Sequence, residues 1–260
     1  MSNPFDQQKP IPGVKNIIAV SSGKGGVGKS TISTHLAMAM AAKGLSVGLL
    51  DADIYGPSIP RMMGTMNQKP ELQENMLMPI LAGGIKTMSM GNLVEEDLAV
   101  VWRGPMLFKA LNQFLFEVNW SGTDLLIIDL PPGTGDVQLS MAQKIPLNGV
   151  ISVSTPQNVA LADVKKSIDM FRRVNIPHFG LIENMSYLVL PNTNEKLQIF
   201  PKGELESFLA KENILKIGEV PMNPQIGQNC EVGLPLKFKP EAPENKPFMD
   251  IADKLMAQLF

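Results

Sequence analysis

Residues 23–31 read Gly-Lys-Gly-Gly-Val-Gly-Lys-Ser-Thr, and this stretch decides the fold. It satisfies the pattern G-x-x-x-x-G-K-[ST], in which a glycine-rich loop surrounds the phosphates of a nucleotide. An apolar, β-branched run at 17–21 precedes the loop, and apolar residues at helical spacing follow it as far as Gly44. Strand, glycine-rich turn and helix are the setting that the motif requires. The sequence therefore predicts that the chain binds a nucleoside triphosphate.

Each part of the loop has an expected role at the phosphates. We expect its four glycines to adopt positive φ and to turn backbone N–H groups inward around the anion. Lys29 is expected to bridge the β- and γ-phosphates, Ser30 to ligate Mg²⁺, and Thr31 to reach the α-phosphate. The predicted nucleotide contacts of the loop are Gly23, Lys24, Gly25, Gly26, Val27, Gly28, Lys29, Ser30 and Thr31.

Lys24 is the unusual residue of the loop. It leaves the loop at its open end, where Lys29 and magnesium already neutralise the phosphates bound by the same chain. A lysine at this place can reach the nucleotide of a second subunit, as an arginine finger does in trans. This interpretation implies a two-fold homodimer with ATP at the interface. The alternative is a solvated loop lysine.

Aspartates at the ends of apolar strands complete a predicted hydrolytic site. Asp51 and Asp53 end one apolar run, and Asp129 ends another. Mg²⁺ is a hard octahedral ion that keeps several waters. We therefore expect Ser30 to ligate it directly, and Asp129 and Asp51 to act through water. Asp53 is expected to orient the attacking water. The candidate catalytic residues are Lys24, Lys29 and Asp53.

The loop after Asp129 reads Leu-Pro-Pro-Gly-Thr-Gly-Asp. Its Gly133 could bring an N–H group close to the γ-phosphate. The loop would then sense whether that phosphate is present.

Strand and helix patterns alternate along the chain. Strand signals occur at 17–21, 47–52, 85–90, 124–130, 149–154, 178–183 and 215–220, and helical patterns at 29–43, 105–117, 137–143, 161–173, 204–211 and 245–259. This alternation predicts an α/β fold with a doubly wound, mostly parallel sheet and helices on both faces, the fold of P-loop NTPases. Ligands of such sheets bind at the carboxyl ends of the strands. We expect a flexible N-terminal arm over 1–15 and a single P-loop ATPase domain over 16–260.

Composition excludes several classes of protein. The net charge is −2, so there is no broad basic footprint for nucleic acid. One cysteine excludes an intramolecular disulfide and is consistent with a reducing compartment. No apolar run is long enough to span a bilayer, and the N-terminus lacks the pattern of a signal peptide. We expect a cytoplasmic protein that binds neither nucleic acid nor a membrane.

Methionine and histidine side chains can bind metal ions, and the chain contains both types. The segment 60–106 is rich in methionine. Thioethers can bind Cu(I), but adaptable packing is the interpretation we favour. His35 and His178 have no ligand-type neighbours at metal spacing, so both are interpreted as structural.

The motifs resemble those of a known class of ATPases. The loop, the paired aspartates and the run at 129–136 are similar to those of the deviant Walker A ATPases, the class of MinD, ParA and nitrogenase iron protein. Narrower motifs resemble the Mrp/ApbC family of ATP-hydrolysing iron–sulfur cluster carriers. They are Asp-Ala-Asp-Ile-Tyr-Gly-Pro-Ser at 51–58, Trp-Arg-Gly-Pro at 102–105 and Glu-Asn-Met-Ser-Tyr at 183–187. The likeness runs from about residue 14 to 240.

The resemblance implies further roles. Lys24 would be the signature lysine that acts across a dimer. Asn184 and the loop near Pro221 would hold adenine, and proteins that scaffold or receive iron–sulfur clusters would be partners. Guanine recognition usually needs Asn-Lys-x-Asp, and the nearest match, at 245–248, lacks the carboxylate. ATP is therefore the expected nucleotide.

One departure from the family concerns its cluster ligands. After the Met-Ser-Tyr element the family carries Cys-Pro-x-Cys, but here the run reads Leu190-Pro191-Asn192-Thr193. Leu190 and Thr193 cannot ligate iron, and Cys230, the single cysteine, is interpreted as a buried small hydrophobe. We expect no iron–sulfur ligands, which leaves binding of a [4Fe–4S] cluster in doubt. Two functions stay open: an ATPase of iron–sulfur cluster assembly or transfer, and an ATP-switched binding, scaffold or positioning protein of the MinD/ParA type that carries no cluster.

Overall fold

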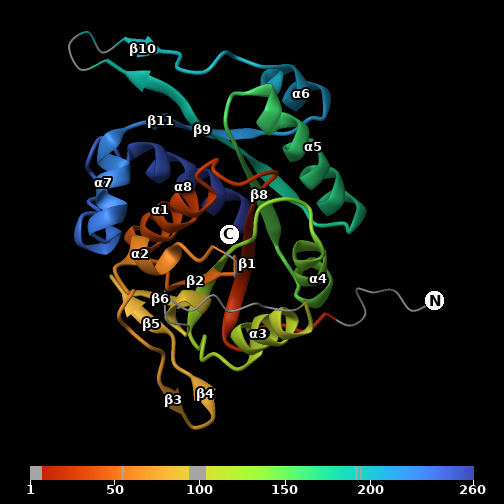
Figure 1. Cartoon of the computed structure of the whole chain (residues 1–260), viewed down its shortest axis with the longest axis vertical. Helices are drawn as coiled ribbons and strands as arrows, with labels where there is room; N and C mark the ends of the chain where they lie inside the picture. Colours follow the sequence, from red (N-terminus) through yellow and green to blue (C-terminus); the bar gives the residue numbers. More distant parts are fainter. Residues whose placement is uncertain (1–7, 54–55, 94–103, 191–192, 194) are drawn as a thin grey trace.

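A computed structural model describes residues 8–53, 56–93, 104–190, 193 and 195–260. In this part of the chain the main sheet has nine strands in the order β10-β9-β8-β1-β7-β2-β6-β5, with β11 paired to β9 (Figure 1). The strands are β1 (Val14–Ser22), β2 (Val47–Asp51), β5 (Ile80–Ala82), β6 (Ile85–Ser89), β7 (Thr123–Asp129), β8 (Gly149–Ser154), β9 (His178–Val189), β10 (Lys196–Leu197) and β11 (Lys216–Met222). A small separate sheet joins β3 (Leu72–Gln73) and β4 (Met76–Leu77).

Helices cover both faces of the main sheet (Figure 1). They are α1 (Lys29–Ala42), α2 (Ile59–Met63), α3 (Gly104–Phe116), α4 (Asp136–Lys144), α5 (Asn158–Arg173), α6 (Leu205–Lys211), α7 (Pro224–Val232) and α8 (Lys246–Leu259), with short 3₁₀ turns η2 (Met90–Asn92) and η3 (Leu234–Leu236). α1 and α8 lie on one face, and α3 and α4 lie on the other.

The strand pairs confirm the predicted fold class. β1 pairs in parallel with β7 and β8, β2 with β6 and β7, and β9 with β8 and β11. Within the described main sheet, the antiparallel pairs are those of the short strands β5 and β10. The protein therefore has a doubly wound, mostly parallel sheet. Seven of its strands lie where the hydrophobic pattern predicts them (β1, β2, β6, β7, β8, β9 and β11), whereas the short strands β3, β4, β5 and β10 were not predicted.

The continuous apolar run of β1 follows from burial on both faces. Consecutive residues of a strand point to opposite sides of the sheet. Ile18 and Val20 belong to the core beneath α1 and α8. Ile17 and Ala19 belong to the core beneath α3 and α4. The strand that carries the phosphate loop is thus fixed from both sides.

Some elements were not predicted from the sequence. α2 is five residues long and has proline at its start, and α7 also begins at a proline, so neither shows a clear helical period.

In the methionine-rich segment 60–106, Met63, Met88 and Met90 are buried in the cores, which agrees with a packing role. Residues 94–103 of this segment lie outside the described residues. The division into an arm over 1–15 and one domain over 16–260 stays a prediction. No helix in the described ranges is long and apolar enough to cross a membrane.

His35 joins the helix after the phosphate loop to the C-terminal helix. It is fully buried on α1, and its ring stacks on Phe248 of α8 with ring centroids 4.3 Å apart. Its Nδ1 lies 2.8 Å from the carbonyl oxygen of Thr31. Burial lowers the pKa of His35 from 6.5 to about 4. The imidazole is therefore neutral in the folded protein near pH 7, which fits the predicted structural role.

We predict that His35 makes stability fall in mild acid. Because its folded pKa lies below the unfolded value, its contribution is complete above pH 6.5 and is lost as pH falls toward about 4. The free energy of unfolding should decrease by about 2 kcal/mol from this residue between pH 7.5 and 5. In His35→Leu, urea denaturation should show a smaller decrease over this range than in the unmutated chain. Equal pH slopes in both proteins would contradict the prediction.

Candidate functional site

The phosphate loop connects the carboxyl end of β1 to α1, and two of its four glycines have positive φ. Gly26 and Gly28 have φ values of 79° and 82°, in the left-handed region that favours glycine. The expectation of positive φ at Gly23 and Gly25 is wrong. At Gly23 a Cβ atom would lie 2.3 Å from the backbone nitrogen of Val164 in α5. Glycine is needed there because α5 packs directly against the loop.

Asp129 is the centre of the hydrogen-bonded group beneath the loop. Lys29 Nζ lies 2.7 Å from its Oδ2, and Ser30 Oγ donates to the same oxygen at 2.6 Å. Ser33 Oγ donates to Oδ1 at 2.6 Å. Asp129 is fully buried and Lys29 is 6% exposed. The structure thus brings together the predicted phosphate-binding lysine, the predicted magnesium ligand Ser30 and the carboxylate at the end of β7.

Asp51 lies next to this group at the end of the neighbouring strand. It is the register partner of Asp129 in the β2–β7 pair. Its carboxylate accepts hydrogen bonds from Ser89 Oγ at 2.9 Å and from the backbone nitrogen atoms of Asp53 and Ile59. Burial, and next the negative charge of Asp129, raise the pKa of Asp51 to about 7. Lys29 pairs with Asp129 at 2.7 Å, and Asp51 is a second buried carboxyl group beside that pair.

A pocket opens over the loop. It is lined by Ser22, Lys24, Gly25, Gly26, Gly28, Lys29, Ser30, Thr31, Asp53, Ser58, Met62 and Pro132. Asp53 is partly buried, and burial raises its pKa above the ordinary value although the charge of Lys29 opposes this. The three candidate catalytic residues Lys24, Lys29 and Asp53 thus line the same pocket as three of the loop glycines.

Five predicted nucleotide contacts lie outside the lining of this pocket: Gly23, Val27, Gly133, Asn184 and Pro221. The Gly133 N–H donates to the carbonyl of Ser22, the last residue of β1 before the phosphate loop, at 2.9 Å. Asn184 is buried on β9, and its Nδ2 donates to the Val27 carbonyl at 2.8 Å. Pro221 lies in β11, the strand that pairs with β9.

Sequence reasoning missed several side chains of the site. Ser33 and Ser89 donate hydrogen bonds to the two buried carboxylates. Ser58, the residue before α2, and Met62 within α2 line the pocket. Ser33 could have been found, because it follows Lys29 by one helical turn. Ser89 ends β6, so its place beside Asp51 requires knowledge of the strand order.

The positions that hold cysteine in the Mrp/ApbC motif lie in the β9–β10 hairpin. Leu190 donates its backbone N–H to the Glu195 carbonyl at 2.9 Å, and Thr193 is exposed and accepts a hydrogen bond at Oγ1 from the Glu195 N–H. Pro191 and Asn192 lie outside the described residues. Cys230 is 6% exposed on α7, and burial raises the pKa of its thiol to about 11. The hairpin offers no thiolate, and Cys230 is a buried thiol.

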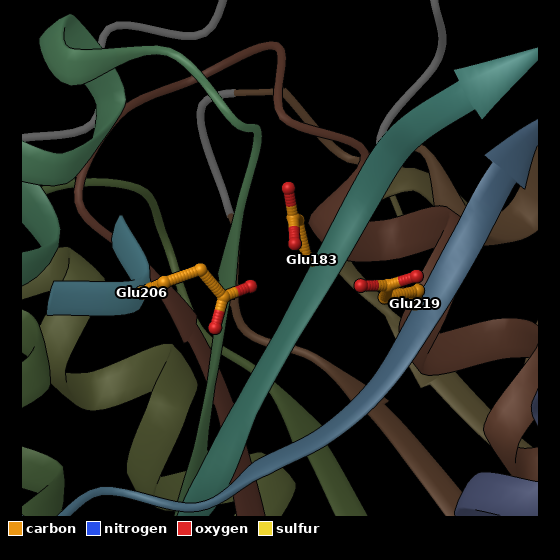
Figure 2. Close-up of side chains that lie close together, drawn as sticks. All are labelled: Glu183, Glu206 and Glu219. Carbon is orange, nitrogen blue, oxygen red and sulfur yellow. The ribbon is translucent and has the colours of Figure 1, made fainter. Parts of the chain in front are cut away.

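A cluster of carboxylates elsewhere has the composition of a metal site. Glu183, Glu206 and Glu219 lie close together (Figure 2). The Lys216 ammonium lies among them, 3.1 Å from Glu183 and 2.5 Å from Glu219, and also pairs with Glu206. Although burial opposes it, hydrogen bonds to these carboxylates raise the pKa of Lys216 above its usual value. The cation that the cluster binds is the lysine, which ties α6 to β9 and β11.

We predict that Lys216→Met destabilises the fold. The Glu183 side chain is 8% exposed and would lose its cation, so the free energy of unfolding should fall by about 1–3 kcal/mol. Lys246→Met is the matched control, because the Lys246–Asp250 pair is exposed on α8 and should contribute less than about 0.5 kcal/mol. Urea denaturation measures both. Equal losses in the two variants would contradict the assignment.

Comparisons with known proteins now decide the family. The family model of the NUBPL iron-transfer P-loop NTPases matches residues 13–256. The chain belongs to this family. It is 45% identical over 259 residues to an iron–sulfur cluster carrier protein of Aquifex aeolicus, covering 98% of this chain and 71% of the relative. It is 46% identical over 263 residues to the iron–sulfur cluster transfer protein NUBPL of Mus musculus, covering 100% of this chain and 82% of the relative.

A solved structure gives the same result for the fold. A nucleotide-binding protein of Archaeoglobus fulgidus in complex with ADP is 35% identical and superimposes with a TM-score of 0.80, covering 95% of this chain and 97% of that one. The resemblance predicted from the motifs is thereby confirmed. Of the residues that carried it, Ile54, Tyr55, Trp102 and Arg103 lie outside the described residues.

Proposed function

We propose that this chain is a Mg²⁺-dependent ATPase that works as a homodimer in the assembly or transfer of iron–sulfur clusters. The observation that supports the ATPase most is the convergence of Lys29, Ser30 and Ser33 on the buried Asp129 directly beneath the loop. A lysine, a hydroxyl and a carboxylate at a helix N-terminus are the groups that P-loop NTPases use around the β- and γ-phosphates and their metal.

The donor set beside the loop suits Mg²⁺. Ser30 Oγ and Asp129 are already hydrogen-bonded, and Asp51 is the register partner of Asp129. All three offer the hard oxygen ligands that Mg²⁺ prefers. We propose that Ser30 ligates the ion directly and that both aspartates hold its waters. When bound, the ion neutralises charge on the phosphate oxygens.

The remaining residues of the pocket are assigned to hydrolysis of ATP to ADP and phosphate. Asp53 orients the attacking water opposite the bond between the β- and γ-phosphates. Lys24 of the partner subunit stabilises the charge that develops on the leaving phosphate oxygen. Lys24 lies at the pocket of its own chain, so a two-fold pairing of loops brings it to the other nucleotide. The Gly133 N–H lies close to the γ-phosphate, so its loop senses whether this phosphate is present. The residues around Asn184 and Pro221 bind adenine.

A pair of lysine variants tests the ATPase. Lys29→Ala should weaken MgATP binding on the order of 100-fold, because a charged contact to the phosphates is lost. Lys24→Ala should leave the Kd nearly unchanged but lower kcat on the order of 1,000-fold. Calorimetry and phosphate release measure these effects. Lys15→Ala is the control, since Lys15 pairs with Asp124 near the opposite end of β1. Unchanged turnover in Lys24→Ala would contradict the proposal that Lys24 acts on the nucleotide of the partner subunit.

The proposed iron–sulfur role rests on the names of the relatives, while the β9–β10 hairpin lacks the cysteines that would bind a cluster. Relatives are named as cluster carriers or transfer proteins, whereas Leu190 and Thr193 supply no ligand and Cys230 is buried. We therefore propose that the clusters handled by this ATPase are bound chiefly by its scaffold or client proteins.

Anaerobic reconstitution with iron and sulfide tests this assignment. The unmutated chain should retain almost no iron or acid-labile sulfide, because it lacks a pair of accessible thiolates. The double variant Leu190→Cys with Thr193→Cys should gain a [4Fe–4S] cluster per dimer, since two chains then provide four thiolates. Iron bound by the unmutated chain and lost in Cys230→Ala would show direct binding through Cys230 instead.

The ligand-free hairpin also favours a second candidate, an ATP-switched binding or scaffold protein that carries no cluster. The two candidates differ in one measurement. If the ATPase serves cluster transfer, ATP should change the rate at which a cluster moves from a scaffold protein to an apo-client in its presence. An unchanged rate, with ATP hydrolysis intact, would favour the second candidate.

A further inference from the structure

Asn184 connects the core of the sheet to the phosphate loop. It lies on β9 and is 5% exposed. Its side-chain Nδ2 donates a hydrogen bond of 2.8 Å to the backbone carbonyl of Val27. Val27 is itself 2% exposed and belongs to the core beneath α1. The middle of the loop is therefore held by an apolar side chain and by a hydrogen bond to its carbonyl.

The position of this carbonyl fixes the direction of a phosphate-binding group. In a planar trans peptide the C=O and the N–H point in opposite directions. The carbonyl of Val27 and the N–H of Gly28 belong to the same peptide unit. Because the carbonyl points to Asn184, the Gly28 N–H points away from β9. Gly28, but not Val27, lines the pocket over the loop.

Close packing supports the same arrangement. A Cβ atom on Gly28 would lie 2.2 Å from Asn184 Nδ2, so the amide fills the space that a side chain at Gly28 would need. Gly28 also has φ of 82° and is the N-cap of α1. Its carbonyl accepts from the Ile32 N–H at 3.0 Å. Asn184 thus packs against the residue where the loop becomes the helix.

We propose that Asn184 is a positioning residue for the phosphate site: its amide holds the Val27 carbonyl, and thereby directs the Gly28 N–H toward the nucleotide phosphates. This role rests on the proposed nucleotide function and is independent of the base. A residue that contacts adenine alone would leave the binding of phosphate groups unchanged. A residue that orients the loop affects any ligand that carries the polyphosphate.

The test uses Asn184→Asp, which keeps the shape of the side chain but has no N–H when ionised. Calorimetry gives the Kd values of MgATP, MgGTP and inorganic tripolyphosphate for each protein. We expect tripolyphosphate binding to weaken about 5- to 100-fold, the effect of leaving a buried acceptor without its donor. Asn184→Ala is a second variant without the added charge, and thermal unfolding shows that each variant is folded.

Ser186→Ala is the matched control. Ser186 is 4% exposed on the same strand and donates from Oγ to a backbone carbonyl, that of Val220, at 3.1 Å. This bond joins β9 to β11 rather than to the phosphate loop, so the Ser186 variant should bind tripolyphosphate as the unmutated chain does.

The outcomes separate the two proposals. Weaker tripolyphosphate binding in both folded Asn184 variants, but not in Ser186→Ala, supports positioning, and a still larger loss for ATP alone reports an added contact with adenine. Unchanged tripolyphosphate binding in either folded Asn184 variant overturns the positioning role, even if ATP binding falls. If the unmutated chain binds none of the three ligands, the proposed function fails instead.

Discussion

The buried ion pair between Lys29 and Asp129 is the interaction on which the site depends. Removing both charges from water is costly, and the pair is stable only because hydroxyl groups satisfy the remaining carboxylate oxygens. Ser30 and Ser33 provide those bonds. Asp51 lies beside the pair with a raised pKa, so the buried group has more acidic than basic side chains. Such a group is suited to a ligand that brings a cation with its phosphates.

The parallel sheet explains how distant residues meet at this pair. Carboxyl ends of neighbouring parallel strands share one edge of a sheet. The order β8-β1-β7-β2-β6 therefore places the loop after β1 between the ends of β7 and β8, and brings Asp51 and Ser89 to the same edge. β2 and β8 are buried along their whole length, and β1, β6 and β7 are buried toward their carboxyl ends. The strand order fixes where each side chain lies. The loop supplies the lysine and the Ser30 hydroxyl, and the strand ends supply the carboxylates.

The sequence predicts those parts of the site that are encoded locally. The phosphate loop, the seven longer strands of the main sheet, and Asp51 and Asp129 at strand ends follow from short patterns and lie where expected. Features that depend on packing between remote segments could not be predicted. Gly23 is glycine because α5 lies against it. Asn184 bonds to Val27, which is 157 residues away in the chain. Ser89 reaches Asp51 because β6 happens to be the neighbour of β2.

β9 is a single covalent element that begins in the core, touches the phosphate loop at Asn184 and continues into the hairpin that contains Leu190. Extended backbone rises about 3.3 Å per residue, so the two points are separated by roughly 20 Å of strand. Met185, directly after the contact with the loop, has a φ of 54° within this strand. The hairpin and the contact with the phosphate loop are therefore parts of one continuous strand, and the pairing of β9 with β11 changes register between them.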